Sequence, residues 1–154
     1  MSRAPMHPLL KLLIVAVIFF ACYTGIKFLI AYVRFYDIKS KMEEAARNSF
    51  TESDNNIALK LAETALTDKL PIAGDYFYQV KDDQGKISIL IPVTLADSQE
   101  YQRLATQYFI KNIQHGSSRE FSIAIAYDQE IYFPFNLYTH VIKFHHEEIQ
   151  QQTK

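Results

Sequence analysis

The chain has 154 residues, enough for one small domain, and its 16 Lys and Arg residues nearly balance its 17 Asp and Glu residues. This balance argues against a basic nucleic-acid-binding surface, and the sequence has no nucleic-acid-binding motif. Hydrophobic residues make up 49% of the chain, with ten Tyr and eleven Phe, which excludes a disordered composition. The single cysteine, Cys22, excludes an intramolecular disulfide and a zinc site built from cysteines.

An uncharged apolar stretch runs from residue 12 to residue 26 and, after Lys27, resumes from 28 to 33. At a rise of about 1.5 Å per residue, the segment 12–33 spans roughly 33 Å, enough to cross the hydrocarbon core of a membrane. We therefore predict an N-terminal tail at 1–11 and a transmembrane helix at 12–33. The Lys27 side chain would then extend towards the headgroups or face a partner helix.

Two other interpretations of this segment compete with a permanent anchor: a cleaved signal sequence and a lipidated cysteine. A cleaved signal sequence would have a shorter apolar region that ends in a small-x-small site, whereas the hydrophobicity here continues well beyond such a point. The sequence Phe19-Phe20-Ala21-Cys22 loosely resembles a lipobox. Lipidation of Cys22 would leave 23–33 as an apolar stretch with no membrane to cross, so we predict a small apolar residue in a helix, with lipidation as the alternative.

Beyond the membrane, the same helix is expected to continue as an amphipathic stalk at 34–48. No Gly or Pro occurs from residue 26 to residue 70, so nothing breaks a helix at the stalk. Four apolar residues recur there at helical spacing: Phe35, Ile38, Met42 and Ala45. The other face of the stalk is charged, which is typical of a surface that contacts water or headgroups.

The remainder, 49–148, is predicted to form one α+β domain, which begins with a helix and a hairpin. Ser53 or Asp54 can cap the helix, which ends at Leu70. After it, the periodicity changes from helical to alternating. Two alternating stretches flank the turn sequence Asp82-Asp83-Gln84-Gly85, and they predict a β-hairpin with strands at 76–81 and 86–93.

A third helix is predicted from Asp97 or Ser98 to a stop at Gly116. The strand that follows, at 121–127, alternates large apolar residues with small ones, so that one face is suited to a core.

Two further strands are predicted at 130–133 and 137–146, on either side of a bend at 134–136. A proline there would bend the strand or place it at the edge of the sheet. A polar tail is predicted at 149–154, and the polar residues 147–154 are expected to fray. The predicted fold class is α+β: a long N-terminal transmembrane helix, followed by a small domain of helices packed on one face of an antiparallel sheet.

The histidines near the C-terminus are candidate metal ligands. They form one cluster with two acids: His140, His145, His146, Glu147 and Glu148. His140 and His146 share a face of a strand, but they are about 20 Å apart, too far for one metal ion. We therefore expect a polar strand end and no metal. The sequence has no phosphate-binding loop and no nucleophile or zinc-protease motif. It predicts a protein that is not an enzyme, without a cofactor or small-molecule substrate.

The order of elements resembles the pilin-like architecture, in which an apolar helix runs into a small α+β domain; here that helix passes through Tyr36-Asp37-Ile38-Lys39-Ser40-Lys41-Met42-Glu43-Glu44-Ala45-Ala46. More narrowly, the chain resembles an uncharacterised family of short bacterial single-pass membrane proteins. Members end with a strand that finishes in Tyr, a bend near Pro and a last strand that finishes in Phe, as 121–127, 134–136 and 137–144 do here. The chain lacks the Gly-Phe processing site of type IV pilins and their Glu just inside the mature helix.

This resemblance implies a signal anchor in the bacterial inner membrane, with the N-terminus inside and the C-terminal domain in the periplasm. Basic residues near the helix ends favour the opposite orientation by number: Arg3 and Lys11 precede the helix, whereas Arg34, Lys39, Lys41 and Arg47 follow it. Both orientations stay open, with the periplasmic domain preferred.

Three functions are compatible with these features: a non-enzymatic interaction or assembly module, an accessory subunit of a larger respiratory or transport complex, and a pseudopilin-like filament subunit. Each would contact membrane lipid and either a membrane protein partner or a second copy of the chain. Small, polar and aromatic side chains are the candidate contacts in and near the membrane, because they permit close helix packing or set depth: Ala16, Ala21, Gly25, Lys27, Tyr32, Phe35 and Tyr36. The candidate stalk contacts are Ile38, Met42 and Ala45.

Overall fold

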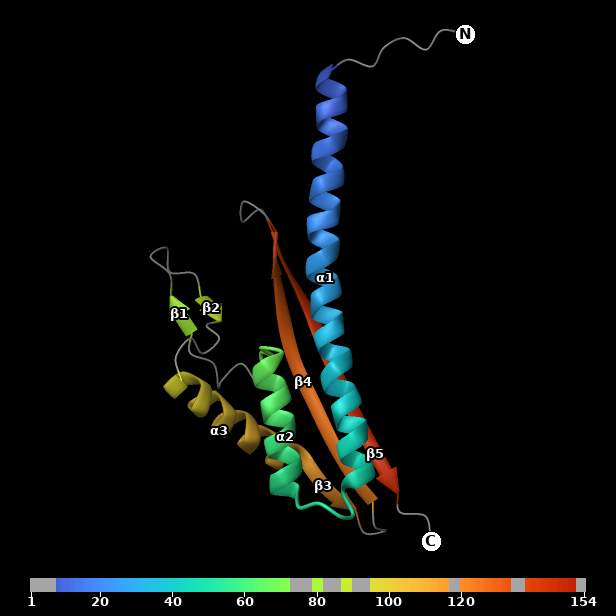
Figure 1. The fold of residues 1–154 in the computed structure, drawn as a ribbon, viewed down its shortest axis with the longest axis vertical. Helices are drawn as coiled ribbons and strands as arrows, with labels where there is room; N and C mark the ends of the chain where they lie inside the picture. Colours follow the sequence, from blue (N-terminus) through green and yellow to red (C-terminus); the bar gives the residue numbers. More distant parts are fainter. Residues whose placement is uncertain are drawn as a thin grey trace.

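The computed structural model describes residues 8–72, 79–81, 87–89, 95–116, 120–133 and 138–151. Its longest element is a single helix of 41 residues, α1 (Pro8–Asn48), which runs from the apolar segment through the stalk without a break (Figure 1). The predicted continuity of the two segments is confirmed. The helix ends where the Ser49 hydroxyl donates a hydrogen bond to the Ala46 carbonyl, at 2.7 Å.

The second helix, α2 (Asp54–Thr67), begins at the predicted cap. The Ser53 side chain accepts a hydrogen bond from the Asn56 N–H at 3.4 Å, which satisfies one of the free donors of the first turn. At the other end, Lys69 adopts a positive φ of 56°. The Leu70 N–H then donates to the Ala65 carbonyl at 2.9 Å, so the helix closes with a left-handed residue.

The strands form two antiparallel sheets. A small sheet pairs β1 (Gln79–Lys81) with β2 (Ile87–Ile89), which confirms the predicted hairpin for the described residues; the predicted turn at 82–85 lies outside them. The larger sheet has the order β3-β4-β5. Its strands are β3 (Ile113–Gly116), β4 (Glu120–Tyr132) and β5 (Thr139–Gln151).

The third helix, α3 (Leu95–Asn112), is shorter than predicted at its C-terminal end. The residues between Asn112 and the expected stop at Gly116 form β3 instead, and Ile113 lies opposite Ile123 on β4. Pairing with β4 competes with helix continuation here, and the His115 ring also contacts the Phe121 ring, with centroids 5.6 Å apart. The prediction of a helix to Gly116 was wrong because this partner strand is supplied by a later part of the chain.

Two other boundaries in the larger sheet differ from the predictions. The strands expected at 121–127 and 130–133 are one continuous strand, because Asp128 and Gln129 pair with Lys143 and Ile142 of β5. The tail expected to fray is ordered as far as Gln151, which lies opposite Glu120. In both places cross-strand hydrogen bonds outweigh the local preference of polar residues for turns and chain ends.

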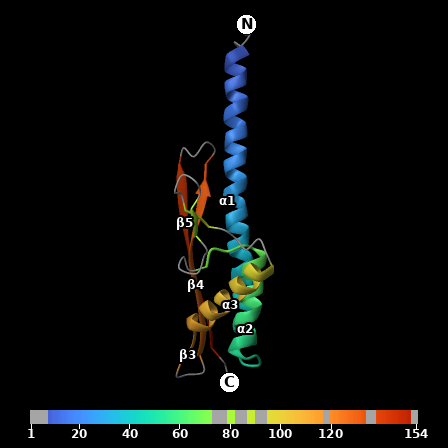
Figure 2. The same cartoon turned by 90° about the vertical axis from the view of Figure 1, so that its left-hand side faces the viewer.

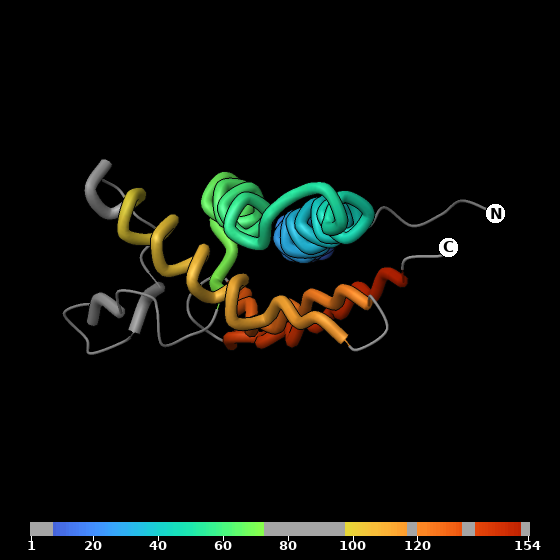
Figure 3. The backbone as a smooth tube through the Cα atoms, turned by 90° about the horizontal axis from the view of Figure 1, so that it is seen from below, coloured from blue at the N-terminus to red at the C-terminus, as the bar shows by residue number. Residues whose placement is uncertain are grey.

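The helix α1 lies over one face of the β4–β5 pair with α2 at its side, and α3 packs between α2 and the strands β3 and β4 (Figure 3). The side chains of β4 that face the helices are buried, as the alternating pattern predicts: Phe121, Ile123, Ile125, Tyr127 and Ile131. From α1 the stalk contributes the buried Ile38, Met42 and Ala46. The stalk and the α+β domain therefore share one hydrophobic core, and the fold is α+β.

Candidate functional site

The N-terminal part of α1 extends alone beyond the ends of β4 and β5 (Figure 2). Its large apolar side chains are exposed, with 71% of the surface of Leu9, 70% of Leu12 and 73% of Phe19 accessible. By length and composition, α1 is sufficient to cross a membrane, and none of its most apolar portion is covered by the rest of the chain. A core helix of a globular protein would bury this surface, so it is available to lipid or to another helix.

The end of the β4–β5 hairpin contacts α1 partway along the apolar segment. The Lys27 Nζ donates a hydrogen bond to the Tyr132 carbonyl at 3.0 Å, and it lies 4.8 Å from the centroid of the Tyr23 ring. Phe133, next along the chain, contacts Phe20 and Phe28, with ring centroids 6.2 and 6.5 Å apart. These contacts supply a partner for the single lysine within the apolar segment and mark where the folded part of the molecule ends.

The predicted helix-contact residues divide into two groups in the structure. Ala16, Ala21 and Gly25 lie on the uncovered part of α1 and are exposed. No described atom outside the local helix backbone lies within 4 Å of a Cβ built on Gly25, so the surface there is open. Lys27, by contrast, is partly buried against the hairpin.

The three aromatic residues predicted to set membrane depth lie beside the hairpin. The Phe35 ring stacks on that of Phe144, with centroids 4.6 Å apart, and the Tyr32 ring meets Phe144 edge-on at 5.4 Å. Tyr36 points away from the sheet and has 63% of its surface exposed. Two of the three therefore hold β5 against α1.

The predicted stalk contacts are used within the chain. Ile38 and Met42 have no exposed surface, and Ala45 is partly buried against the same core. This face of the stalk fills the core of its own chain, and it is therefore not available to a partner while the chain is folded.

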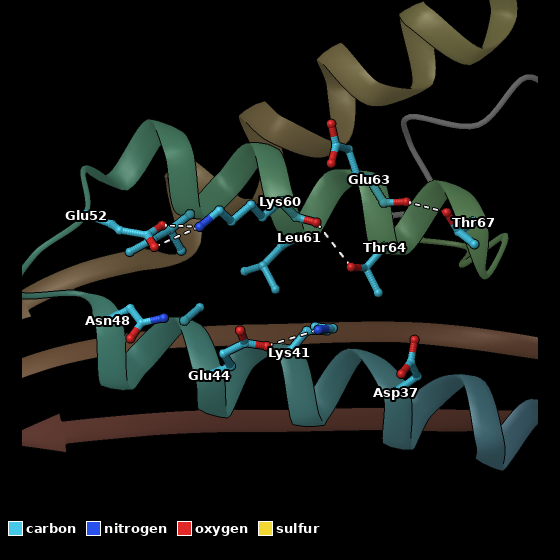
Figure 4. Close-up of a pocket in the computed structure, with 12 residues that line it drawn as sticks. Asp37, Lys41, Glu44, Asn48, Glu52, Lys60, Leu61, Glu63, Thr64 and Thr67 are labelled. Carbon is cyan, nitrogen blue, oxygen red and sulfur yellow. Dashed lines mark hydrogen bonds and ion pairs between the residues drawn. The ribbon is translucent and has the colours of Figure 1, made fainter.

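A groove of about 430 Å³ lies between α1 and α2 (Figure 4). Leu61 points into it, and charged side chains form its edges. Lys60 binds Glu52 at 2.6 Å and Lys41 binds Glu44 at 3.0 Å. Both lysines are thus paired with carboxylates of the same groove, and Asp37 and Glu63 leave the lining with an excess of acidic groups.

A cluster of polar side chains that includes Asp68 and Tyr127 lies where α1, α2 and β4 meet. Burial, then a hydrogen bond and repulsion from Asp37, raise the pKa of Asp68 from 3.8 to about 6, while Arg34 opposes this shift. The Tyr127 hydroxyl is buried there without a hydrogen-bond partner among the described residues. Burial, with the nearby Asp68 charge, raises the pKa of Tyr127.

Sequence reasoning missed the contact between the hairpin end and α1. A signal was present, because aromatic residues cluster around the predicted bend at 134–136, including Tyr132, Phe133 and Tyr138. Nothing local in the sequence indicated that this end would reach Lys27, which is more than 100 residues away along the chain.

Comparison of the chain with protein-family models, with curated proteins and with solved structures finds no match in any of the three. The resemblance to pilin-like single-pass proteins therefore stays a prediction, and the functional argument depends on the chain itself.

Proposed function

We propose that the chain is a single-pass membrane protein whose folded part, held at the membrane surface by α1, is a non-enzymatic interaction or assembly module. One observation carries the proposal: residues 8–26 of α1 are apolar apart from Lys11, are almost all exposed and contact the rest of the fold at Phe20, whereas the helix after them is packed against a hairpin. At about 1.5 Å per residue, 8–26 spans about 28 Å, close to the thickness of the hydrocarbon core.

The hairpin end supports a membrane boundary near Lys27 instead of the predicted boundary at Val33. If the bilayer extended to Val33, the hairpin end beside Phe20 and Phe28 would be immersed in hydrocarbon. The open edges of a sheet are not tolerated there, since their N–H and C=O groups would have no partners. With the boundary at Lys27, its ammonium lies in the headgroup region, and only the part of the hairpin end that contacts Phe20, about 10 Å along α1 from Lys27, extends past the boundary.

Exposed apolar residues outside this span support a protein partner. On the face of α1 away from the hairpin, Leu29 and Val33 have 62% and 57% of their surfaces exposed. Within the span, Ala21 and Gly25 are four residues apart, which places two small side chains on one face where helices can approach closely. These two surfaces are continuous along α1 and suit a second membrane helix.

The proposed location is the bacterial inner membrane with the folded part in the periplasm, which is the orientation of a signal anchor. Two alternatives differ only in the partner: an accessory subunit would bind an unrelated membrane protein, and a pseudopilin-like subunit would bind copies of itself. Extraction in a mild detergent, with the size and composition of the complex determined together, separates them.

The anchor is tested with the double variant Val15→Arg/Ile18→Arg. Both side chains are about half exposed in the middle of the free segment, so the folded part loses no contact. Each arginine costs about 2.5 to 3.5 kcal/mol at the centre of a spanning helix. We expect the variant to be released from membranes by alkaline carbonate, while the wild type and a Tyr36→Arg control remain. Retention of the double variant to the same extent as the control would contradict a spanning helix.

A further inference from the structure

Three side chains that can bind a metal converge near the end of the molecule remote from the apolar segment. Glu43 comes from α1, and His146 and Glu148 come from β5. Because successive side chains on a strand point to opposite faces, the two β5 residues share the face that lies against α1. One ligand atom from each of the three residues lies within 4.8 Å of the others, and all three side chains are partly buried.

The imidazole of His146 lacks a satisfactory partner. Its Nε2 is buried and makes no hydrogen bond with any described residue. A Glu148 oxygen lies 3.3 Å away, but not in the geometry of a hydrogen bond. Among the described residues, the ion pair of Glu43 is a long one, 4.0 Å from its carboxylate oxygen to the Lys39 Nζ. A buried ring nitrogen beside two carboxylates costs free energy unless a cation or proton occupies the space.

We propose that Glu43, His146 and Glu148 bind one divalent ion of the first-row transition metals, of the Zn²⁺ type. Imidazole and carboxylate together suit Zn²⁺, whereas Ca²⁺ and Mg²⁺ prefer sites made only of oxygen. Zinc ligands lie about 2.0 to 2.2 Å from the ion, and three protein ligands leave a fourth position for water. The three ligand atoms now lie within 4.8 Å of one another, so they must come closer together to bind one ion.

Such an ion would join β5 to α1 where the two elements have few large apolar contacts. Phe144 is the last residue of β5 with a buried apolar side chain; the residues after it are polar apart from Ile149, which is 51% exposed. The ion would thus hold the last part of the sheet against the stalk. The alternative is that the three side chains form a polar cluster with no affinity for metal.

The sequence offers a matched control on the same strand. His145 is the neighbour of His146 and Glu147 is the neighbour of Glu148, yet both are exposed on the opposite face of β5. A histidine or a glutamate can therefore be removed from either face with the same change in composition.

The test is calorimetric titration of the full chain in detergent micelles with ZnCl₂, after dialysis against a chelator. We expect one saturable site per chain. Binding should weaken by more than about 100-fold in His146→Ala and strongly in Glu148→Gln. Mutation of residues that only support the ligands already lowers metal affinity by about 10–100-fold, and loss of a ligand should cost more. His145→Ala and Glu147→Gln should bind as the wild type does.

Thermal unfolding of the same proteins separates loss of the site from loss of the fold. Zn²⁺ should raise the Tm of the wild type and of His145→Ala, and leave the Tm of His146→Ala unchanged, provided that far-ultraviolet circular dichroism shows the variant folded. If His146→Ala is unfolded, Glu148→Gln takes its place in this comparison. Absence of saturable binding to the wild type, or equal losses in His145→Ala and His146→Ala, would overturn the proposal.

Discussion

At the scale of single residues, Asp68 has an electrostatically unfavourable position. It caps the C-terminal end of α2, where its carboxyl is drawn into the contact with α1 and one of its oxygens is buried without a hydrogen bond to any described residue. Burial and the neighbouring Asp37 both favour the protonated form, and its pKa rises from 3.8 to about 6. The charge of Asp68 therefore opposes folding at neutral pH.

The sign of this effect gives a pH-dependent prediction for Asp68→Asn. Between about pH 4 and pH 6 the folded state holds a proton that the unfolded state releases, so stability falls as the pH rises, and the loss is complete above pH 6. Asn cannot ionise. We expect Asp68→Asn to raise the free energy of unfolding at pH 7 by about 1 kcal/mol, after allowance for solvent screening, with no gain at pH 4.

Chemical denaturation at the two pH values measures this difference. Asp128→Asn, at an exposed carboxylate on β4, is the control for removing one negative charge from the chain. An equal gain in both variants, or a gain for Asp68→Asn that is the same at pH 4 and pH 7, would assign the effect to net charge instead.

At the scale of elements, β4 is much longer than its neighbour β3. Pairing with β3 involves only 120–123, so the following residues of β4 have no strand partner on that edge within the described part of the chain. Tyr108 of α3 covers part of it: its hydroxyl accepts a hydrogen bond from the Ala126 N–H at 2.9 Å and donates one to the Ala126 carbonyl at 3.2 Å. One side chain thus substitutes for a strand at this residue.

Tyr108→Phe removes both hydrogen bonds and keeps the ring. We expect it to lower the free energy of unfolding by about 1 kcal/mol, because the backbone groups lie near solvent and water replaces part of what is lost. Amide hydrogen exchange at Ala126 should become faster. Tyr36→Phe removes a hydroxyl from an exposed ring and should change neither quantity. Unchanged exchange at Ala126 in Tyr108→Phe would show that the edge is protected in another way.

The elements also show which parts of the fold can be predicted from the sequence. Features set within a few residues were predictable, such as the Ser53 cap and the alternation in β4. Features set by distant pairing were not: the strand identity of 113–116 depends on β4, and the order of the polar residues up to Gln151 depends on Glu120 and its neighbours. The same limit hid the cluster of Glu43, His146 and Glu148, because a strand spacing of two residues brings together only two of its three members.

At the scale of the whole molecule, the depth of α1 in the membrane follows from packing and not from hydropathy alone. Residues 28–33 are as apolar as the segment before them, and hydropathy therefore assigns them to the span. In the fold, however, Phe28 is partly buried against the hairpin and Ala31 has only 6% of its surface exposed. Part of the apolar character of this stretch is accounted for by contacts within the chain.

A membrane boundary near Lys27 and one at Val33 predict different depths for Tyr36 and Tyr138. The chain contains no tryptophan, so a single introduced tryptophan can report depth by its fluorescence. Tyr138 is exposed at the hairpin end, beside the ring of Phe133, and Tyr36 is exposed nine residues after Lys27 on α1. With a boundary near Lys27, Tyr36 lies about 14 Å outside the hydrocarbon, whereas with a boundary at Val33 it lies within about 5 Å of it. The measurement is the quenching of tryptophan fluorescence in Tyr138→Trp and Tyr36→Trp, each in vesicles that contain brominated lipids.

For the boundary near Lys27, we expect the emission of Tyr138→Trp to be quenched, most strongly by bromines near the headgroups, and that of Tyr36→Trp to be unaffected. Phe50→Trp, at an exposed site beyond the end of α1, gives the value for a probe in water. Quenching of Tyr36→Trp, together with quenching of Tyr138→Trp by bromines deep in the acyl chains, would place the boundary at Val33. The hairpin edges would then have to be satisfied by a partner inside the membrane, since lipid cannot supply the missing hydrogen bonds.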